Sequence, residues 1–152
     1  FYERLRLLYS FMLFGSVIIS IPISIFSEYL INLLYKEQYN LASTVLMIHI
    51  WAGILVSLGL VTSNLVISNN KQKNALVATS IGAISNIIIN LLLIPHYGIV
   101  GAALATIFSQ MIAGLFVPIF FKIDPHYPKI LIYSIWDFPK LVLTHLKKLL
   151  KT

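Results

Sequence analysis

The stretch ALVATSIGAISNIIINLLLIPHYGIVGAALATIFSQMIAGLFVPIFF, residues Ala75–Phe121, contains no Asp, Glu, Lys or Arg. It is interrupted once, by the sequence PHYG at Pro95–Gly98. The apolar segments on either side, Ala75–Ile94 and Ile99–Phe121, each have about the 20 residues that an α-helix needs to cross a bilayer core. The stretch therefore predicts a membrane helical hairpin, in which Pro95, Gly98 and Gly101 have structural roles.

The composition of the whole chain is that of a membrane protein. Hydrophobic residues make up 59% of the 152 residues and charged residues 11%, whereas soluble domains have about 25% charged residues. The net charge of +6 comes from basic residues outside the apolar segments. This distribution favours contact with anionic membrane lipids over contact with nucleic acid. The chain has no cysteine, which excludes disulfides and cysteine-based metal sites.

Four apolar segments predict an all-α fold, a polytopic membrane helical bundle with four transmembrane helices. Their approximate bounds are 7–34, 42–68, 75–94 and 99–121. These runs are continuous and far longer than the alternating strands of a membrane barrel, which have about 9–11 residues. Pro22 lies inside the first segment, where we expect a kink because proline removes a backbone hydrogen bond.

The distribution of lysine and arginine predicts the orientation of the bundle. If the N-terminus is cytoplasmic, ten of the 11 basic residues fall on the cytoplasmic side and only Lys36 falls on the other. Such a bias follows the positive-inside rule. We therefore expect both ends of the chain to be cytoplasmic and the Pro95–Gly98 turn to be external.

Residues 122–152 are less apolar, and we interpret them as a cytoplasmic tail. Between about residues 138 and 151, leucine and valine fall on one helical face and lysine on the other. This is the pattern of a basic amphipathic helix that lies in the membrane interface. Trp136 and Tyr133, just upstream, are residue types that favour the same interface. The alternative is a solvated helix packed on a soluble domain.

Polar and small residues form a stripe in each arm of the predicted hairpin. Asn86 and Asn90 recur at helical spacing in the first arm, and Ser109 and Gln110 lie among Gly and Ala residues in the second. Small residues allow membrane helices to approach closely, and Asn or Gln can form hydrogen bonds between them. The stripes are either packing seams or the wall of a water-filled cavity, and the four residues are candidates for a substrate pathway.

Glu28 and His49 are the acidic and basic side chains within the first two predicted spans. Ionisable groups inside membrane segments are costly and often belong to a proton or ion pathway. Both residues lie near a predicted span end, where a long side chain can also reach water. They are further pathway candidates, with an interfacial position as the alternative.

Signals of an enzyme are weak. No two of the four histidines have the i, i+4 spacing that places two metal ligands on one helix face. The chain also lacks the phosphate-binding motif G-x-x-x-x-G-K-[ST], the nucleophile motif G-x-S-x-G and a close pair of acidic residues. We therefore predict no catalytic, cofactor-binding or metal-binding residue and expect that the protein is not an enzyme.

The run Asn86–Thr106, with the pattern N-x3-N-x4-P-x2-G-x2-G-A-A-x-A-T, resembles the late hairpin of bacterial polysaccharide flippases. These are the Wzx-type O-antigen, capsule and exopolysaccharide-unit transporters of the multidrug/oligosaccharidyl-lipid/polysaccharide exporter superfamily. The segment Leu34–Ala42, LYKEQYNLA, resembles a loop of the same family, although Lys36 stands where glycine is usual.

The resemblance implies a larger bundle, of about twelve to fourteen helices in two lobes, around a partly cationic cavity. It implies that oligosaccharide repeat units linked to undecaprenyl diphosphate are flipped across the bacterial cytoplasmic membrane by alternating access. The chain begins at Phe1, and we expect it to supply the last spans of such a transporter. The implied partners are the lipid-linked oligosaccharide, membrane lipids, the remaining helices, and polysaccharide polymerase and chain-length machinery.

Two alternatives stay open beside this interpretation. One is an exporter of drugs or of a peptidoglycan precursor within the same superfamily. The other is a small, non-transporting membrane protein that packs against partner helices through its Gly, Ala and Ser faces.

Overall fold

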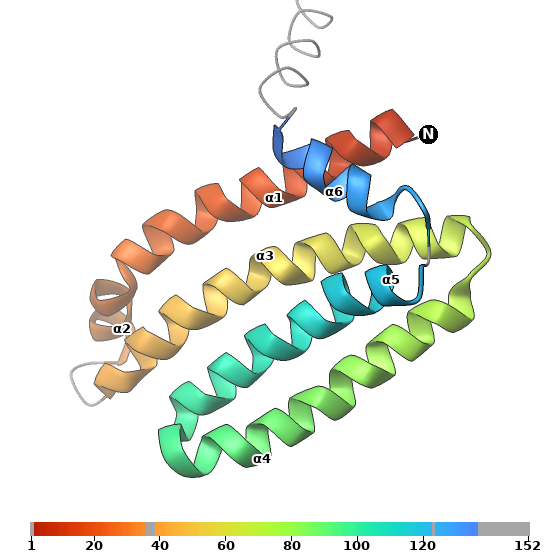
Figure 1. The fold of residues 1–152 in the computed structure, drawn as a ribbon. Coiled ribbons are helices and arrows are strands. Elements are labelled where there is room, and N and C mark those ends of the chain that lie inside the picture. Colours follow the sequence, from red (N-terminus) through yellow and green to blue (C-terminus); the bar gives the residue numbers. More distant parts are fainter. Residues whose placement is uncertain (1, 36–38, 123, 137–152) are drawn as a thin grey trace, which may run out of the picture.

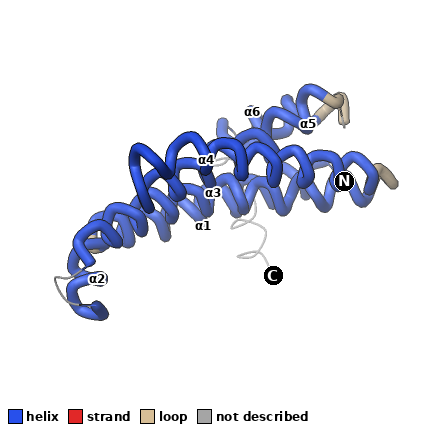
Figure 2. The backbone as a smooth tube through the Cα atoms, turned by 90° about the horizontal axis from the view of Figure 1, so that it is seen from below, coloured by secondary structure: helices blue, strands red, loops and turns tan. Residues whose placement is uncertain are grey.

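The structure is a computed structural model that describes residues 2–35, 39–122 and 124–136. The described elements, in chain order, are α1 (Tyr2–Ile25), α2 (Ser27–Tyr35), α3 (Asn40–Ser68), α4 (Gln72–Met111), a π-helical turn (Ile112–Phe116), α5 (Val117–Phe120) and α6 (Tyr127–Trp136). Figure 2 shows helices and short connections but no strand in this part of the chain. Three helical stretches, Tyr2–Ile25, Leu41–Ser68 and Gln72–Phe120, are long and apolar enough to cross a membrane. The prediction of an all-α membrane bundle is therefore confirmed.

The longest of these stretches is a hairpin, as Figure 1 shows. The backbone of Gly98 is not helical, with φ 55° and ψ −134°, and only glycine adopts such angles readily. Beyond Gly98 the chain runs back along itself: Gly82 faces Ala113, and Asn86 contacts Ser109. In two antiparallel helices the residue numbers of every facing pair add up to the same total, and these two pairs meet that condition. The predicted segments 75–94 and 99–121 are thus the two arms of one hairpin.

The arms pack so closely that two of their glycines leave no room for a side chain. A Cβ atom on Gly82 would lie 2.6 Å from the Cβ of Ala113. A Cβ atom on Gly101 would lie 2.5 Å from the carbonyl oxygen of Leu93, just across the turn. Backbone atoms of the two arms can approach each other only because these positions are glycine.

The structure corrects the prediction of a single helix over residues 7–34. α1 ends at Ile25, and a separate short helix, α2, begins at Ser27. The Ser27 hydroxyl donates a hydrogen bond to the carbonyl of Ser24 (3.0 Å), a local bond that bends helices. Pro22, where we expected the kink, lies inside α1, and the break comes four residues later. Figure 2 shows α2 turned away from α1 at this end of the bundle.

α3 spans the predicted segment 42–68 and ends in a turn that asparagine favours. Asn70 has a positive φ of 55°. Its N–H donates to the carbonyl of Ile67 (3.0 Å), and the N–H of Lys71 donates to the carbonyl of Val66 (3.0 Å). This pair of bonds is a Schellman motif, which satisfies the last carbonyls of the helix. α4 begins directly afterwards, so α3 and α4 are neighbours.

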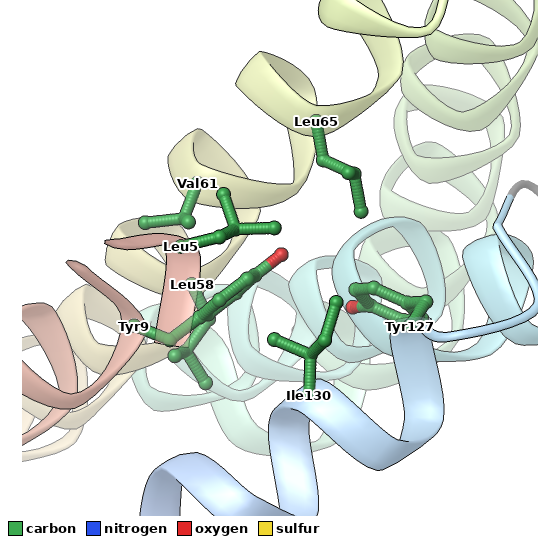
Figure 3. Close-up of a cluster of buried hydrophobic side chains, with 7 residues drawn as sticks. All are labelled: Leu5, Tyr9, Leu58, Val61, Leu65, Tyr127 and Ile130. Atoms are coloured by element: carbon green, nitrogen blue, oxygen red, sulfur yellow. The ribbon is translucent and has the colours of Figure 1, made fainter. Parts of the chain in front are cut away.

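The hydrophobic core lies at one end of the bundle, where α6 crosses the start of α1 (Figure 1). Its buried members come from α1, α3 and α6: Leu5, Tyr9, Leu58, Val61, Leu65, Tyr127 and Ile130. Figure 3 shows that these side chains point toward one another. α6 was not predicted from the sequence, because we interpreted all of residues 122–152 as a tail. The predicted amphipathic helix at 138–151 lies outside the described residues.

The close approach at Gly101 predicts that a larger residue at this position destabilises the hairpin. Gly101→Ala should lower the free energy of unfolding by about 1–3 kcal/mol, because the new methyl group overlaps the Leu93 carbonyl. Gly15→Ala in α1 is the matched control, since a Cβ atom there meets nothing within 4 Å. The control should be neutral or stabilising by up to about 1 kcal/mol, because alanine is the better helix former. Equal effects of both substitutions on thermal unfolding would contradict the close packing of the arms.

Candidate functional site

A groove of about 480 Å³ runs between α3 and the α4 hairpin. Small residues of three segments line it, including Gly59, Gly82, Ala83, Ala113 and Gly114. Seven uncharged polar residues also line it: Thr62, Ser63, Thr79, Asn86, Thr106, Ser109 and Gln110. None of the lining residues in the described part of the chain is charged. We take this groove as the candidate functional site.

The Asn stripe predicted from the sequence joins the two hairpin arms and also reaches the groove. The Asn86 amide donates a hydrogen bond to the Ser109 hydroxyl (3.0 Å), and the Asn90 amide donates to the Asn86 side-chain oxygen (2.9 Å). Asn86 and Ser109 line the groove, whereas Asn90 lies beyond it. The packing seam and the groove wall are therefore made partly of the same residues.

Gln110 differs from the other amides of the stripe. It lines the groove beside Ser109 and Thr106, and its side-chain amide has no hydrogen-bond partner among the residues that the structure describes. The Thr106 hydroxyl, by contrast, donates to the carbonyl of Ala102 in its own helix (3.1 Å). The Gln110 amide, like the hydroxyl of the exposed lining residue Ser63, is therefore available to a polar ligand.

The groove ends at a π-helical turn that Pro118 helps to create. Proline has no N–H, so Pro118 cannot donate to the carbonyl of Gly114. The N–H of Val117 donates to the carbonyl of Ile112, five residues back, which widens the turn. The Tyr127 hydroxyl then donates to the carbonyl of Gly114 (2.7 Å). A side chain from α6 thereby supplies a donor where Pro118 has none.

Tyr127 also continues a buried chain of hydroxyl groups. Its oxygen lies 3.2 Å from the Thr62 hydroxyl, which lies 2.9 Å from the Tyr9 hydroxyl. Burial raises the pKa of Tyr127 to about 12, although the hydrogen bond with Thr62 lowers it. The phenol is therefore protonated near neutral pH and can donate. The chain joins α1, α3, α6 and the π-helical turn at one end of the groove.

Two of the predicted pathway residues lie elsewhere. Glu28 is near the start of α2 and His49 is in α3, and both are exposed. Neither lines the groove. Their predicted role in a pathway stays a prediction, as does the pathway role of Asn86, Asn90, Ser109 and Gln110.

A second polar cluster, centred on Asp124, was not predicted from the sequence. This carboxylate is buried and accepts hydrogen bonds from Tyr2, Asn69 and His126. The signal that could have revealed it is the sequence Asp124–Pro125–His126 just before an apolar run, because Asp and Pro are common where a helix begins. What the sequence does not show is that two distant segments meet the same carboxylate.

Comparisons with known proteins give a consistent result. A family model described as Lipid II flippase MurJ matches residues 1–149. An uncharacterized membrane protein of Methanocaldococcus jannaschii is 30% identical over 105 residues, which are 66% of this chain and 21% of that protein. A probable low-salt glycan biosynthesis flippase of Haloferax volcanii is 34% identical over 98 residues, which are 62% of this chain and 21% of that protein. The chain spans about a fifth of the length of these relatives. No solved structure matches it.

The bond between Tyr127 and Gly114 gives a prediction that concerns the end of the groove. Tyr127→Phe should lower the free energy of unfolding by about 1–2 kcal/mol, because a buried carbonyl loses its donor. Tyr133→Phe is the matched control on the same helix, since Tyr133 is 44% exposed. Thermal unfolding of the purified variants measures both effects. A Tyr127→Phe variant as stable as the control would show that the Tyr127 hydroxyl contributes nothing to the free energy of unfolding.

Proposed function

This chain belongs to the lipid II flippase MurJ family, and from this membership we propose that it is part of a transporter that moves a lipid-linked oligosaccharide across a membrane. The observation that carries the proposal is the family match over residues 1–149. The similarity to a flippase of glycan biosynthesis supports it. Members of a flippase family are transporters rather than catalysts, which agrees with the weak enzyme signals of the sequence.

The groove beside the hairpin has the chemistry to meet the sugar part of such a cargo. Sugars carry many hydroxyl groups, and the groove offers amide and hydroxyl groups as hydrogen-bond partners. Gln110 supplies an amide that can both donate and accept. The small residues of the hairpin leave space beside these groups. We therefore assign the sugar part of the cargo to this groove.

A diphosphate would need positive charge, which the described part of the groove does not have. Phosphate groups are bound by arginine and lysine through charge-assisted hydrogen bonds. In our proposal, cationic residues elsewhere in the complete transporter bind the diphosphate. The groove then contributes to recognition of the glycan and not to recognition of the lipid carrier.

Two cargo classes fit the proposal. The resemblance of Asn86–Thr106 to Wzx-type transporters favours repeat units of surface polysaccharides such as O-antigen, capsule or exopolysaccharide. The family match favours the peptidoglycan precursor that gives the family its name. We propose the polysaccharide unit as the cargo and the precursor as the second candidate. The remaining helices of the transporter and the polymerase and chain-length machinery are its proposed partners.

The positions of the basic residues support a cytoplasmic orientation for the α6 end. Figure 1 places the start of α1, the α3–α4 turn and α6 at the same end of the bundle. These segments and the connection before α6 carry all the lysines and arginines that the structure describes: Arg4, Arg6, Lys71, Lys73, Lys122 and Lys129. By the positive-inside rule this end faces the cytoplasm. We propose that the protein lies in the cytoplasmic membrane, with the Gly98 turn outside.

The proposed role of the groove is tested by Gln110→Leu in the complete transporter. The initial rate of flipping of a lipid-linked oligosaccharide in membrane vesicles should fall by roughly 3- to 30-fold, the factor for one lost hydrogen bond in a membrane protein. The amount of protein in the membrane should stay the same, because the Gln110 amide bonds to no described residue.

Met111→Leu is the matched control, since Met111 is the next residue of the same arm and is replaced by an apolar residue of similar size. Its flipping rate should equal that of the unchanged protein. If Gln110→Leu reduces the rate only as far as it reduces the amount of protein, Gln110 is a packing residue and the groove assignment is wrong.

The orientation is tested with reporter fusions. Fusions after Lys73 and after Thr152 should be active as cytoplasmic reporters, because lysine-rich connections stay inside. A fusion at His96, beside the Gly98 turn, should be active as an external reporter. An external result at Lys73 would contradict the orientation.

A further inference from the structure

One buried carboxylate connects three separate segments at the α6 end of the bundle. The side chain of Asp124 is 4% exposed and lies between α5 and α6. Its Oδ2 atom accepts hydrogen bonds from the side-chain amide of Asn69 (2.9 Å) and from the hydroxyl of Tyr2 (3.3 Å). Asn69 caps the end of α3, and Tyr2 begins α1. The carboxylate thus bonds to residues 55 and 122 positions away in the sequence.

The second oxygen of Asp124 makes local bonds. Oδ1 accepts a hydrogen bond from the backbone N–H of His126 (2.7 Å) and lies 3.3 Å from Nδ1 of the same residue. The N–H of Tyr127 donates to the Asp124 carbonyl (3.1 Å), so this residue also starts α6. One carboxylate oxygen therefore accepts its hydrogen bond at the start of α6, while the other accepts hydrogen bonds from the start of α1 and the end of α3.

The charge state of Asp124 suits this role. Burial raises the pKa of the carboxyl group, but the hydrogen bonds from the His126 N–H, from Asn69 and from Tyr2 outweigh it and hold the pKa below the ordinary value of 3.8. The group is therefore ionised near neutral pH and acts as an acceptor only. Hydrogen bonds to a charged acceptor are stronger than bonds between neutral groups.

We propose that Asp124 is the centre of a latch that holds the start of α1, the α3–α4 turn and α6 together, and that this latch opens when the α6 end of the groove opens to cargo. A polar cargo can cross a membrane only if the protein opens to one side and then to the other, so contacts at each end must break and re-form. The bonds from Asn69 and Tyr2 meet at one atom, so a small displacement of Asp124 breaks both. The opening step rests on the proposed function, whereas the latch itself does not.

The latch is tested by a substitution on one segment and a measurement on another. In the complete transporter, Asn69→Ala removes the amide at the end of α3 and leaves α6 itself unchanged. Hydrogen exchange of the backbone amides of α6, residues 127–136, should nevertheless become roughly 10-fold faster, the factor for one lost hydrogen bond to a charged group. Asn64→Ala is the matched control, because Asn64 is an exposed asparagine of the same helix.

Asp124→Asn removes the charge and should speed hydrogen exchange in α6, the α3–α4 turn and the start of α1 together. If exchange becomes faster only in the first turn of α6, Asp124 is merely a helix cap and the latch does not exist. An unchanged α6 in Asn69→Ala would also overturn it. Should Asp124→Asn not fold, Asn69→Ala decides alone, because it leaves the buried carboxylate in place.

The opening step has its own measurement. Val66 lines the groove near the α3–α4 turn and is 1% exposed. In a cysteine-free background, Val66→Cys should react with a maleimide roughly 10-fold faster when Asp124→Asn is present, and at an unchanged rate with Glu3→Gln, an exposed carboxyl group at the same end. Coupled exchange without faster labelling would overturn the opening step alone. Flipping that is insensitive to Gln110→Leu would count against the groove assignment and not against the latch.

Discussion

The backbone-to-backbone contact between the two arms of the hairpin is the constraint on which the groove depends. Gly82 and Gly101 leave no space for a Cβ atom, so the arms lie close enough for Asn86 to bond with Ser109. Within a bilayer, polar side chains have no water to bond with, and a direct bond between two helices satisfies both. The close contact fixes which faces of the arms are turned toward α3, and those faces form the wall of the groove.

Pro118 has no backbone N–H group, and the hydrogen bond that replaces the missing one connects this hairpin to the rest of the molecule. Pro118 interrupts the series of backbone hydrogen bonds in the helix, and the Gly114 carbonyl accepts a hydrogen bond from the Tyr127 hydroxyl instead. Tyr127 contacts Thr62, and Thr62 contacts Tyr9. Through these hydroxyl groups the end of the groove is joined to the core around Leu5 and Ile130. A proline in one arm is therefore coupled to the packing of α6 on α1.

The sequence was sufficient for the features that depend on composition and local chemistry. The charge-free run 75–121 and the position of Gly98 predicted the hairpin, and the apolar run 42–68 predicted α3, because length and hydrophobicity decide whether a segment crosses a bilayer. The polar stripe was also visible in the sequence. The sequence did not show which of its residues pack between the arms and which line the groove. That division depends on the rotation of each arm, which the spacing of a few residues does not fix.

The features that the sequence did not reveal depend on contacts between distant segments. The break between α1 and α2 comes after Ile25, beyond Pro22, and the continuous apolar run gives no sign of it. α6 has ten residues, too few to cross a membrane, and its composition alone does not show that Tyr127 and Ile130 are buried against α1. Asp124 looked like one of a few scattered acidic residues, because its partners Tyr2 and Asn69 lie far away in the chain.

The composition of the core has a consequence for biosynthesis. Leu5 and Tyr9 lie near the beginning of the chain, and Tyr127 and Ile130 lie more than a hundred residues later. Translation completes α1, α3 and the hairpin before α6, because α6 follows them in the chain. Until then the Thr62 hydroxyl has only its Tyr9 partner and lacks Tyr127, and the Gly114 carbonyl lacks its Tyr127 donor. The nascent protein therefore passes through a stage in which its spans are synthesised but its core is incomplete, and the synthesis of α6 marks the end of that stage.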